Sequence, residues 1–253
     1  MTAPGTLTVT NDNKIATITF GHPSGNSFPA ALLQRLTDAL EMLGRDAEVS
    51  LIVLRSEGEG AFCAGASFDE LLAVIDLDGG TKFFSGFANV INAMRVCPKL
   101  IVGRVQGKAV GGGVGLAAAC DYVFATENSL VKLSELAIGI GPFVIAPAVE
   151  RKIGLAGLSE LALSPTEWKS AHWAKEKGLY PNVYKDTESM DGALKSFSEN
   201  LASYNPEALR EMKKALWNGT EHWGQLLYER AAISGNLVLS GFTKNALAQF
   251  RKS

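Results

Sequence analysis

The chain has 253 residues, which is enough for one large domain or for one domain with a helical appendage. Hydrophobic residues make up 47% of it and charged residues 20%, the composition of a globular protein with a sizeable core. The net charge of −2 excludes the broad basic field that attracts nucleic acid or an anionic membrane surface, so local donors must meet any anionic ligand.

The cysteines and histidines argue against a metal site. Cys63, Cys97 and Cys120 are scattered, and the three histidines show no metal-ligand spacing. We expect the cysteines to be small buried residues of a cytoplasmic protein in a reducing compartment. No apolar stretch approaches the roughly 20 residues that a membrane-spanning helix needs, and the first residues lack the pattern of a secretion signal.

The hydrophobic pattern predicts strands and helices that alternate through the first two-thirds of the chain. Apolar and polar residues alternate on both sides of a turn-forming run at 11–13, which predicts a β-hairpin over residues 7–20. Apolar runs predict buried strands and helical spacing predicts amphipathic helices. The strands are expected over 50–54, 100–105 and 122–126, and the helices over 30–43 and 81–96. This alternation predicts an α/β fold.

The pattern changes from about Thr187 onward, where helices follow one another without strands. Pro206 is suitably placed for the first turn of one of them. The helices are expected over 188–204, 206–217 and 221–239. We therefore expect an α/β core with the ligand site over residues 1–190 and a helical region over residues 191–253.

A glycine-rich run over residues 109–120 is the densest local signal in the chain. Glycines that run into alanines after a strand indicate a tight turn leading into a closely packed helix. Glycine lets backbone N–H groups approach a ligand, and a helix N-terminus adds unpaired donors and a positive dipole end. Such a place suits a phosphate, or an oxyanion that forms only during a reaction.

Two other interpretations fit part of this run. Gly113, Gly115 and Ala118 match a dinucleotide-binding fingerprint, and Glu135 lies about 20 residues further on. Residues 106–111, however, separate the preceding strand from that fingerprint, and the next predicted strand leaves room for only a short crossover helix. Alternatively, the glycines serve helix packing alone, which explains Gly115 and the alanines.

A second run of small residues, 60–72, follows the strand predicted over 50–54. A helix is expected to begin near Ser67 or Phe68. Two such loops can each offer one backbone N–H to the same oxygen, which an oxyanion hole needs when a thioester carbonyl becomes an enolate. Alone, the run is also typical of an ordinary strand–helix turn.

Together, these segments resemble the crotonase superfamily, the enoyl-CoA hydratase/isomerase family, over nearly the whole chain. Residues 60–68 resemble that family's first oxyanion loop, and residues 106–121 resemble its second. Residues 133–139 match the segment that bears a catalytic glutamate, and residues 22–27 resemble the early loop that contacts coenzyme A. The order and spacing of the four segments make the resemblance specific.

The resemblance implies a crotonase-like spiral of ββα units with a helical C-terminal region, assembled as a homotrimer or as a dimer of trimers. Residues 191–253 would then serve oligomerisation and cover the active site. It also implies an oxyanion hole from the backbone N–H groups of Ala66 and Gly112, with Glu135 as the catalytic carboxylate.

An acyl-CoA thioester is the ligand that the resemblance implies, in fatty acid metabolism or branched-chain amino acid catabolism. No cofactor is expected, because coenzyme A enters as part of the substrate. In the family, a basic residue near the C-terminus of a neighbouring subunit meets a coenzyme A phosphate, a role open to Arg251 or Lys252. The residues expected to bind coenzyme A are Ser24, Asn26, Ala64, Ala66, Ser67, Phe68, Asp69 and Gly112.

One position departs from the family pattern. Two-glutamate hydratases carry a second glutamate three residues beyond the second oxyanion glycine, and this chain has Gly115 there. A hydratase must place water on Cβ and a proton on Cα, whereas an isomerase only moves a proton, which a single base can do. On this count, Gly115 with Glu135 favours an isomerase.

One carboxylate is also sufficient for hydration, because Glu135 could activate water and pass the same proton to Cα on one face. Residues 139–147 resemble bacterial methylglutaconyl-CoA hydratase-type members. We therefore favour the addition of water to a 2-enoyl-CoA, with a methylglutaconyl-CoA-like substrate as one option. The alternatives are conversion of a 3-enoyl-CoA to a 2-enoyl-CoA by Glu135 alone, and binding of acyl-CoA without catalysis.

Either reaction requires Glu135 to exchange a proton near the working pH. We expect apolar neighbours such as Leu133, Leu136 and Phe143 to raise the pKa of its carboxyl group. Without the resemblance, Glu135 would be an exposed carboxylate in the first turn of a helix, where it is favourable with the dipole.

Overall fold

The computed structural model describes residues 4–250 and begins with a β-hairpin. Strand β1 (Thr6–Asp12) pairs antiparallel with β2 (Ile15–Gly21). Asn13 and Lys14 form the turn with φ angles of 49° and 67°, the left-handed conformation that a tight two-residue hairpin requires. The predicted hairpin is confirmed, with its turn one residue further along the chain than expected.

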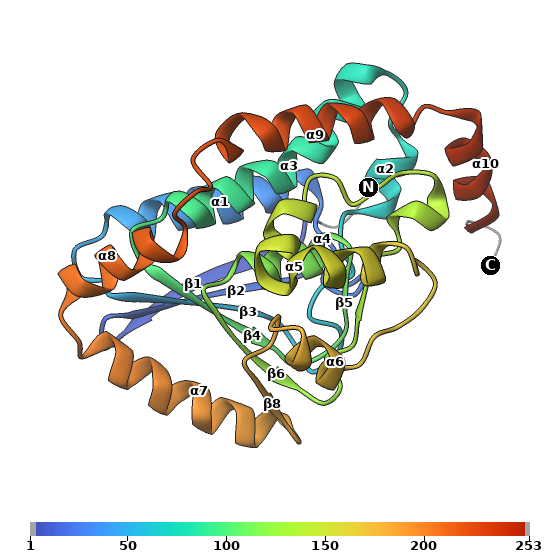
Figure 1. Ribbon diagram of the computed structural model, residues 1–253. Helices are drawn as coiled ribbons and strands as arrows, with labels where there is room; N and C mark the ends of the chain where they lie inside the picture. Colours follow the sequence, from blue (N-terminus) through green and yellow to red (C-terminus); the bar gives the residue numbers. More distant parts are fainter. Residues whose placement is uncertain (1–3, 251–253) are drawn as a thin grey trace.

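A six-stranded sheet forms the centre of the molecule in the order β1-β2-β3-β4-β6-β8 (Figure 1). All neighbouring pairs beyond the hairpin run parallel. The further strands are β3 (Leu51–Ser56), β4 (Leu100–Val105), β6 (Tyr122–Thr126) and β8 (Asn182–Tyr184). A separate two-stranded sheet joins β5 (Ala109–Val110) to β7 (Val131–Lys132). The strands predicted over 50–54, 100–105 and 122–126 are thus confirmed.

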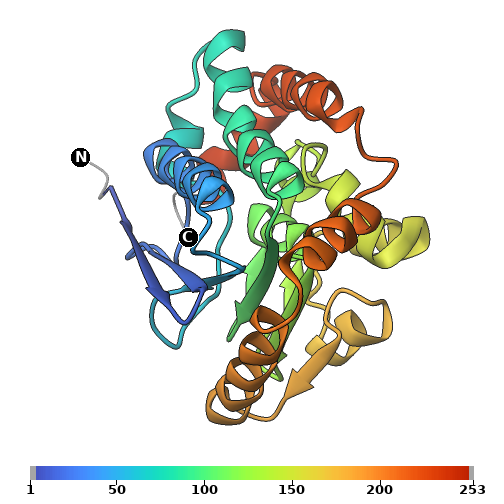
Figure 2. The same ribbon diagram turned by 90° about the vertical axis from the view of Figure 1, so that its left-hand side faces the viewer.

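Helices cover both faces of the six-stranded sheet, which explains why its strands are continuous apolar runs. In β3, Ile52 and Leu54 face the main core, while Leu51 and Val53 face a second core on the other side. Figure 2 shows α1 and α3 on one side of the strands and α7 on the other. The helices of the main core are α1 (Ala30–Arg45), α3 (Leu77–Val96), α4 (Gly112–Ala119) and α5 (Ala146–Ala162).

The helical texture predicted after Thr187 is confirmed, and these helices have different partners. Helices α7 (Thr187–Ala202) and α8 (Pro206–Leu216) supply Met190, Leu194 and Leu209 to the second core. The boundary expected at 190/191 therefore falls inside α7.

The last helices return to the face that carries the main core. Helix α9 (Trp223–Leu237) lies along α3 (Figure 1). A Cβ at Gly80 would lie 2.7 Å from the carbonyl oxygen of Gly235, so small residues let these two helices approach closely. Helix α5 was not predicted, and neither were α6 (Ala171–Glu176) and α10 (Gly241–Phe250).

Strand and helix alternate in the first part of the chain and helices follow in the last, which confirms the α/β class. Within residues 4–250, no helix is both long and apolar enough to cross a membrane. The same residues contain no group of three histidine, cysteine or acidic side chains that could hold a metal ion.

Candidate active site

The first small-residue loop presents the backbone of Ala66 to a cavity. Ala66 bridges to Phe28 through two flanking bonds: the Phe28 N–H donates to the Gly65 carbonyl at 2.8 Å, and the Ser67 N–H donates to the Phe28 carbonyl at 2.9 Å. Because these bonds use the groups on either side of Ala66, its own N–H points away from Phe28, and Ala66 lines the cavity.

The helix predicted after this loop begins at Phe68, as α2 (Phe68–Leu72). Ser67 is its N-cap, and its hydroxyl accepts from the Glu70 N–H at 3.4 Å. Glu70 in turn accepts from the Ala30 N–H at 2.8 Å and so caps α1. Hydrogen bonds to two helix N-termini therefore hold the C-terminal end of this loop in place.

The second loop places Gly112 at the start of α4, where helical N–H groups have no intrahelical partner. The Val110 N–H donates to the Cys63 carbonyl at 2.9 Å, and the Phe62 N–H donates to the Lys108 carbonyl at 2.9 Å. These bonds join the second loop to the first. Both Ala66 and Gly112 line the same cavity.

Glu135 is the first residue of a short 3-10 helix (Glu135–Ile138), and its carboxyl group lies against the second loop. A Cβ at Gly111 would lie 2.8 Å from Glu135 Oε1, so a larger residue would collide with the carboxyl group. Gly111 also has a φ of 53°, a backbone conformation that favours glycine. Glu135 Oε2 is buried without a hydrogen-bond partner among the described residues.

Burial of the Glu135 carboxyl group raises its pKa from 4.5 to about 7, because desolvation disfavours the ionised form. The predicted direction is confirmed, but the apolar neighbours differ in part. Leu133 is buried, whereas Leu136 is 39% exposed. The apolar walls come instead from side chains that the sequence did not single out, including Phe87 and Ile138.

A cavity of about 150 Å³ lies between the two loops, Glu135 and helix α3. Its walls are mostly apolar, and Glu135 is the only ionisable side chain among the described residues that line it. Ser234 of α9 contributes a hydroxyl group that is buried and has no hydrogen-bond partner among the described residues. The apolar lining consists mainly of Phe68, Leu71, Phe83, Phe84, Phe87, Ile138, Ile140, Val144 and Ile145.

The position of the missing second carboxylate is filled by another side chain. A Cβ at Gly115 would lie 2.5 Å from Ile145 Cγ2 and 2.7 Å from Ile145 Cβ. Ile145 immediately precedes α5, and it also lines the cavity. The departure at Gly115 is therefore matched by a bulky apolar residue that occupies the room a longer side chain would need.

The residues expected to bind coenzyme A fall into different surroundings. Ala64, Ala66, Phe68 and Gly112 line the cavity. Ser24 and Asp69 are exposed and do not belong to that lining, and Ser67 is buried as the α2 N-cap. The basic residues Arg251 and Lys252 lie outside the described residues.

Asn26 is 8% exposed, and its side chain is engaged within the protein. Its amide nitrogen donates to the carbonyls of Glu57 at 3.0 Å and Ala61 at 2.8 Å. Its amide oxygen accepts from the His22 N–H at 3.0 Å. Asn26 thus fastens the early loop to the base of the first small-residue loop.

Sequence reasoning missed the phenylalanines of α3 and Ile145 as parts of the site. Phe83, Phe84 and Phe87 are spaced so that a helix presents them on one side, which was a usable signal. Nothing in that spacing shows what the side faces. The contact between Ile145 and Gly115 joins residues 30 positions apart and has no local signature.

This fold, with its two converging loops and one buried carboxyl group, defines a protein of the crotonase class. The family model "Enoyl-CoA hydratase/isomerase" matches residues 10–238, and the chain belongs to that family.

Individual proteins agree with this assignment. The chain is 30% identical over 214 residues to "Probable enoyl-CoA hydratase" from Rhizobium meliloti, covering 83% of this chain and 80% of the relative. It is 32% identical over 200 residues to the mitochondrial methylglutaconyl-CoA hydratase of Rattus norvegicus, covering 78% and 63%. The solved structure of an enoyl-CoA hydratase from Bacillus halodurans superimposes with a TM-score of 0.87 at 20% identity, covering 96% and 99%, which supports the fold.

Proposed function

We propose that this protein catalyses proton transfer on an enoyl-CoA thioester, with Glu135 as its one acid–base group. The thioester oxygen would lie between the N–H groups of Ala66 and Gly112, where negative charge develops when Cα gains or loses a proton. The observation that carries the proposal is the buried Glu135 carboxyl beside the second loop, whose Oε2 has no hydrogen-bond partner among the described residues. A pKa of about 7 lets it both accept and donate a proton at neutral pH.

The coenzyme A part of the substrate would run along the outside of the first loop. Ala64 and Phe68 line the cavity and are also exposed to solvent. They can therefore contact the substrate where it passes from the cavity to the surface. The exposed Ser24 and Asp69 would contact the part of coenzyme A that lies outside the cavity. Asn26 would act indirectly, by holding its loop in place.

Isomerisation of a 3-enoyl-CoA to a 2-enoyl-CoA is the reaction that this arrangement supports best. Glu135 would remove a proton from C2, the electrons would move to the thioester oxygen as a dienolate, and Glu135 would return the proton to C4. One base is sufficient for both transfers. Ile145 takes the room of a second carboxylate, so no second acidic group among the described residues would activate a reacting water beside Glu135. On this ground we place isomerisation ahead of hydration, which the sequence favoured.

Hydration of a 2-enoyl-CoA is the second candidate, and the names of the relatives favour it. The proteins from Rhizobium meliloti and Rattus norvegicus are both named as hydratases, at 30% and 32% identity. In this reaction Glu135 would take a proton from water that attacks C3 and hand that same proton to C2.

The chemistry of the cavity favours a short, uncharged acyl group over a methylglutaconyl-like one. Among the described residues that line the cavity, none is basic, so a distal carboxylate on the substrate would be buried without a partner and near Glu135. A cavity of 150 Å³ is comparable to engineered protein cavities that hold benzene. We therefore propose an apolar acyl group of about six carbons or fewer.

The test is incubation with 3-hexenoyl-CoA and, separately, 2-hexenoyl-CoA, with products followed by NMR. Formation of 2-hexenoyl-CoA from the first substrate supports isomerisation. Formation of 3-hydroxyhexanoyl-CoA from the second supports hydration. Binding of hexanoyl-CoA without turnover of either substrate would indicate a binding protein, and the absence of binding would refute the proposal.

A further inference from the structure

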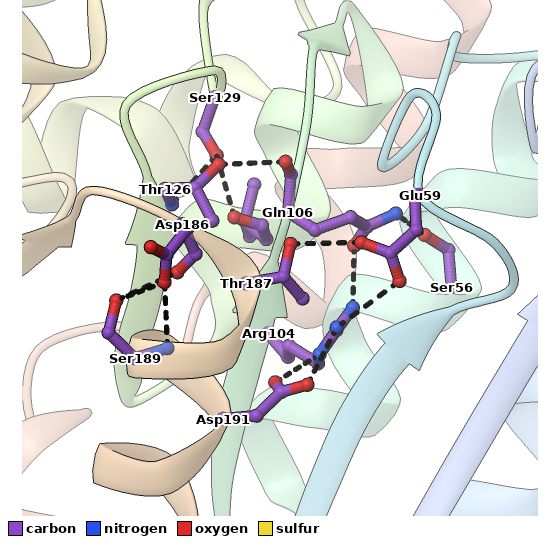
Figure 3. A network of polar contacts seen from close by, with 11 residues as sticks. Ser56, Glu59, Arg104, Gln106, Thr126, Ser129, Asp186, Thr187, Ser189 and Asp191 are labelled. Atoms are coloured by element: carbon purple, nitrogen blue, oxygen red, sulfur yellow. Dashed lines mark hydrogen bonds and ion pairs between the residues drawn. The ribbon is translucent and has the colours of Figure 1, made fainter.

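A buried polar network lies beneath the two oxyanion loops and centres on Gln106 and Arg104 (Figure 3). Gln106 is 2% exposed and Arg104 is 1% exposed. Arg104 belongs to β4, and Gln106 is the first residue after that strand, on the way to Gly112. Neither residue lines the cavity, so a contribution to the reaction has to pass through the loops.

Gln106 joins the base of one loop to the base of the other. Its side-chain nitrogen donates to Ser56 Oγ at 2.8 Å and lies 3.5 Å from the Ala61 carbonyl oxygen. Ser56 ends β3, and Ala61 follows five residues later in the first loop. The Gln106 carbonyl accepts from the Thr126 hydroxyl at 2.8 Å, which ties the second loop to β6 as well.

Arg104 determines which way the Gln106 amide faces. An arginine only donates hydrogen bonds, so the 3.2 Å contact from Arg104 Nη1 requires the amide oxygen of Gln106 on its side. The amide nitrogen must then face Ser56 and Ala61, which is the orientation that links the loops. Arg104 is itself held by Asp191, which accepts from Nε at 2.6 Å and from Nη2 at 2.9 Å.

Helix α7 is connected to the first loop by a second route. The Thr187 hydroxyl donates to Glu59 at 2.9 Å, and Glu59 directly precedes the glycine that begins this loop (Figure 3). Glu59 also lies 3.8 Å from Arg104. The start of α7 is thus linked to both loops, through Asp191 and Arg104 to Gln106 and through Thr187 to Glu59.

We propose that Gln106 is a positioning residue of the oxyanion hole, which sets the spacing between the Ala66 and Gly112 N–H groups. The inference rests on the proposed function, because it concerns the same two donors. Both loops are short and joined at their bases, so a shift there is carried to the donors. A displacement of about 1 Å in a reacting geometry can lower a rate by about 10²-fold.

Gln106→Glu tests this role with little change in volume. The new carboxylate keeps an acceptor for Arg104 but loses the donor that faces Ala61. We expect kcat to fall by about 10- to 100-fold while the Kd for butyryl-CoA changes by less than about 3-fold. The matched control is Glu199→Gln, on the same helix α7, whose exposed pair with Lys195 at 3.9 Å is remote from both loops. This control should retain full kcat.

A spectroscopic measurement separates positioning from a general loss of structure. Oxyanion-hole donors polarise a bound thioester, so infrared difference spectra of carbonyl-labelled butyryl-CoA should show a lowered C=O stretch with the unaltered protein and a smaller shift with Gln106→Glu. If that variant does not fold, Ser56→Ala removes one anchor without adding charge, and a smaller effect of the same kind is expected.

Two results would overturn the inference, and they differ. The first is a folded Gln106→Glu or Ser56→Ala variant whose carbonyl shift is unchanged and whose kcat is within about 2-fold of the unaltered protein's. That result would refute the positioning role of Gln106 but leave the proposed oxyanion hole intact. A lack of any carbonyl shift in the unaltered protein would remove the oxyanion hole itself, and the proposed function with it.

Discussion

Replacing Glu135 by glutamine should change how the stability of the protein depends on pH. The folded state holds the Glu135 proton up to about pH 7, whereas an unfolded chain releases it near 4.5. Between these values the folded state binds more protons, so the free energy of unfolding falls as pH rises through this window. Above the window, the wild-type protein carries a buried, desolvated carboxylate, and the glutamine variant does not.

The size of the effect follows from the pKa difference. A shift from 4.5 to about 7 corresponds to about 3 kcal/mol, at about 1.4 kcal/mol per pKa unit. We therefore expect the free energy of unfolding of wild type, relative to Glu135→Gln, to fall by about 3 kcal/mol between acid and mildly alkaline pH. Both proteins share all other titrating groups, so the contributions of those groups to the pH dependence cancel in the comparison.

Urea unfolding at a series of pH values measures this difference. Trp217 and Trp223 are each 5% exposed, so their fluorescence should report the loss of the native core. The variant should also bind hexanoyl-CoA while its turnover drops by about 10²- to 10⁴-fold, the usual contribution of a general base. Parallel stability curves for the two proteins would show that the Glu135 carboxyl is not desolvated, and the reasoning about its pKa would fail.

Three further outcomes follow from the site. The rate of 3-enoyl-CoA isomerisation, as kcat/KM, should rise with pH through an apparent pKa of about 7, since C2 deprotonation needs the carboxylate; a flat profile would contradict this. Gly115→Glu alone should cost at least about 1–3 kcal/mol in urea unfolding because it meets Ile145, and Gly115→Glu with Ile145→Ala should recover stability and gain hydration of 2-enoyl-CoA. Phe84→Ala should shift the preferred acyl chain to longer substrates in a kcat/KM series, whereas an unchanged series would show that Phe84 does not limit the cavity.

Much of the fold was predictable because its signals are local. A buried parallel strand is a short apolar run, and β4 was predicted with the bounds that the structure has. The two loops were predictable for the same reason, since small residues between a strand and a helix start mark a place where backbone donors can be exposed. Helix α10 escaped prediction, and its ten residues carry no strong amphipathic pattern.

The sequence alone located the two small-residue loops, because small residues and helix starts are read within a few positions; the resemblance then pointed to Ala66 and Gly112 within them. It also placed Glu135 in the matching segment. Only the tertiary structure decided what surrounds that carboxyl: its burial with Oε2 unpaired, the phenylalanines of α3, and Ile145 in the room beside Gly115. Burial and steric contact depend on segments tens of residues apart, so no local pattern encodes them.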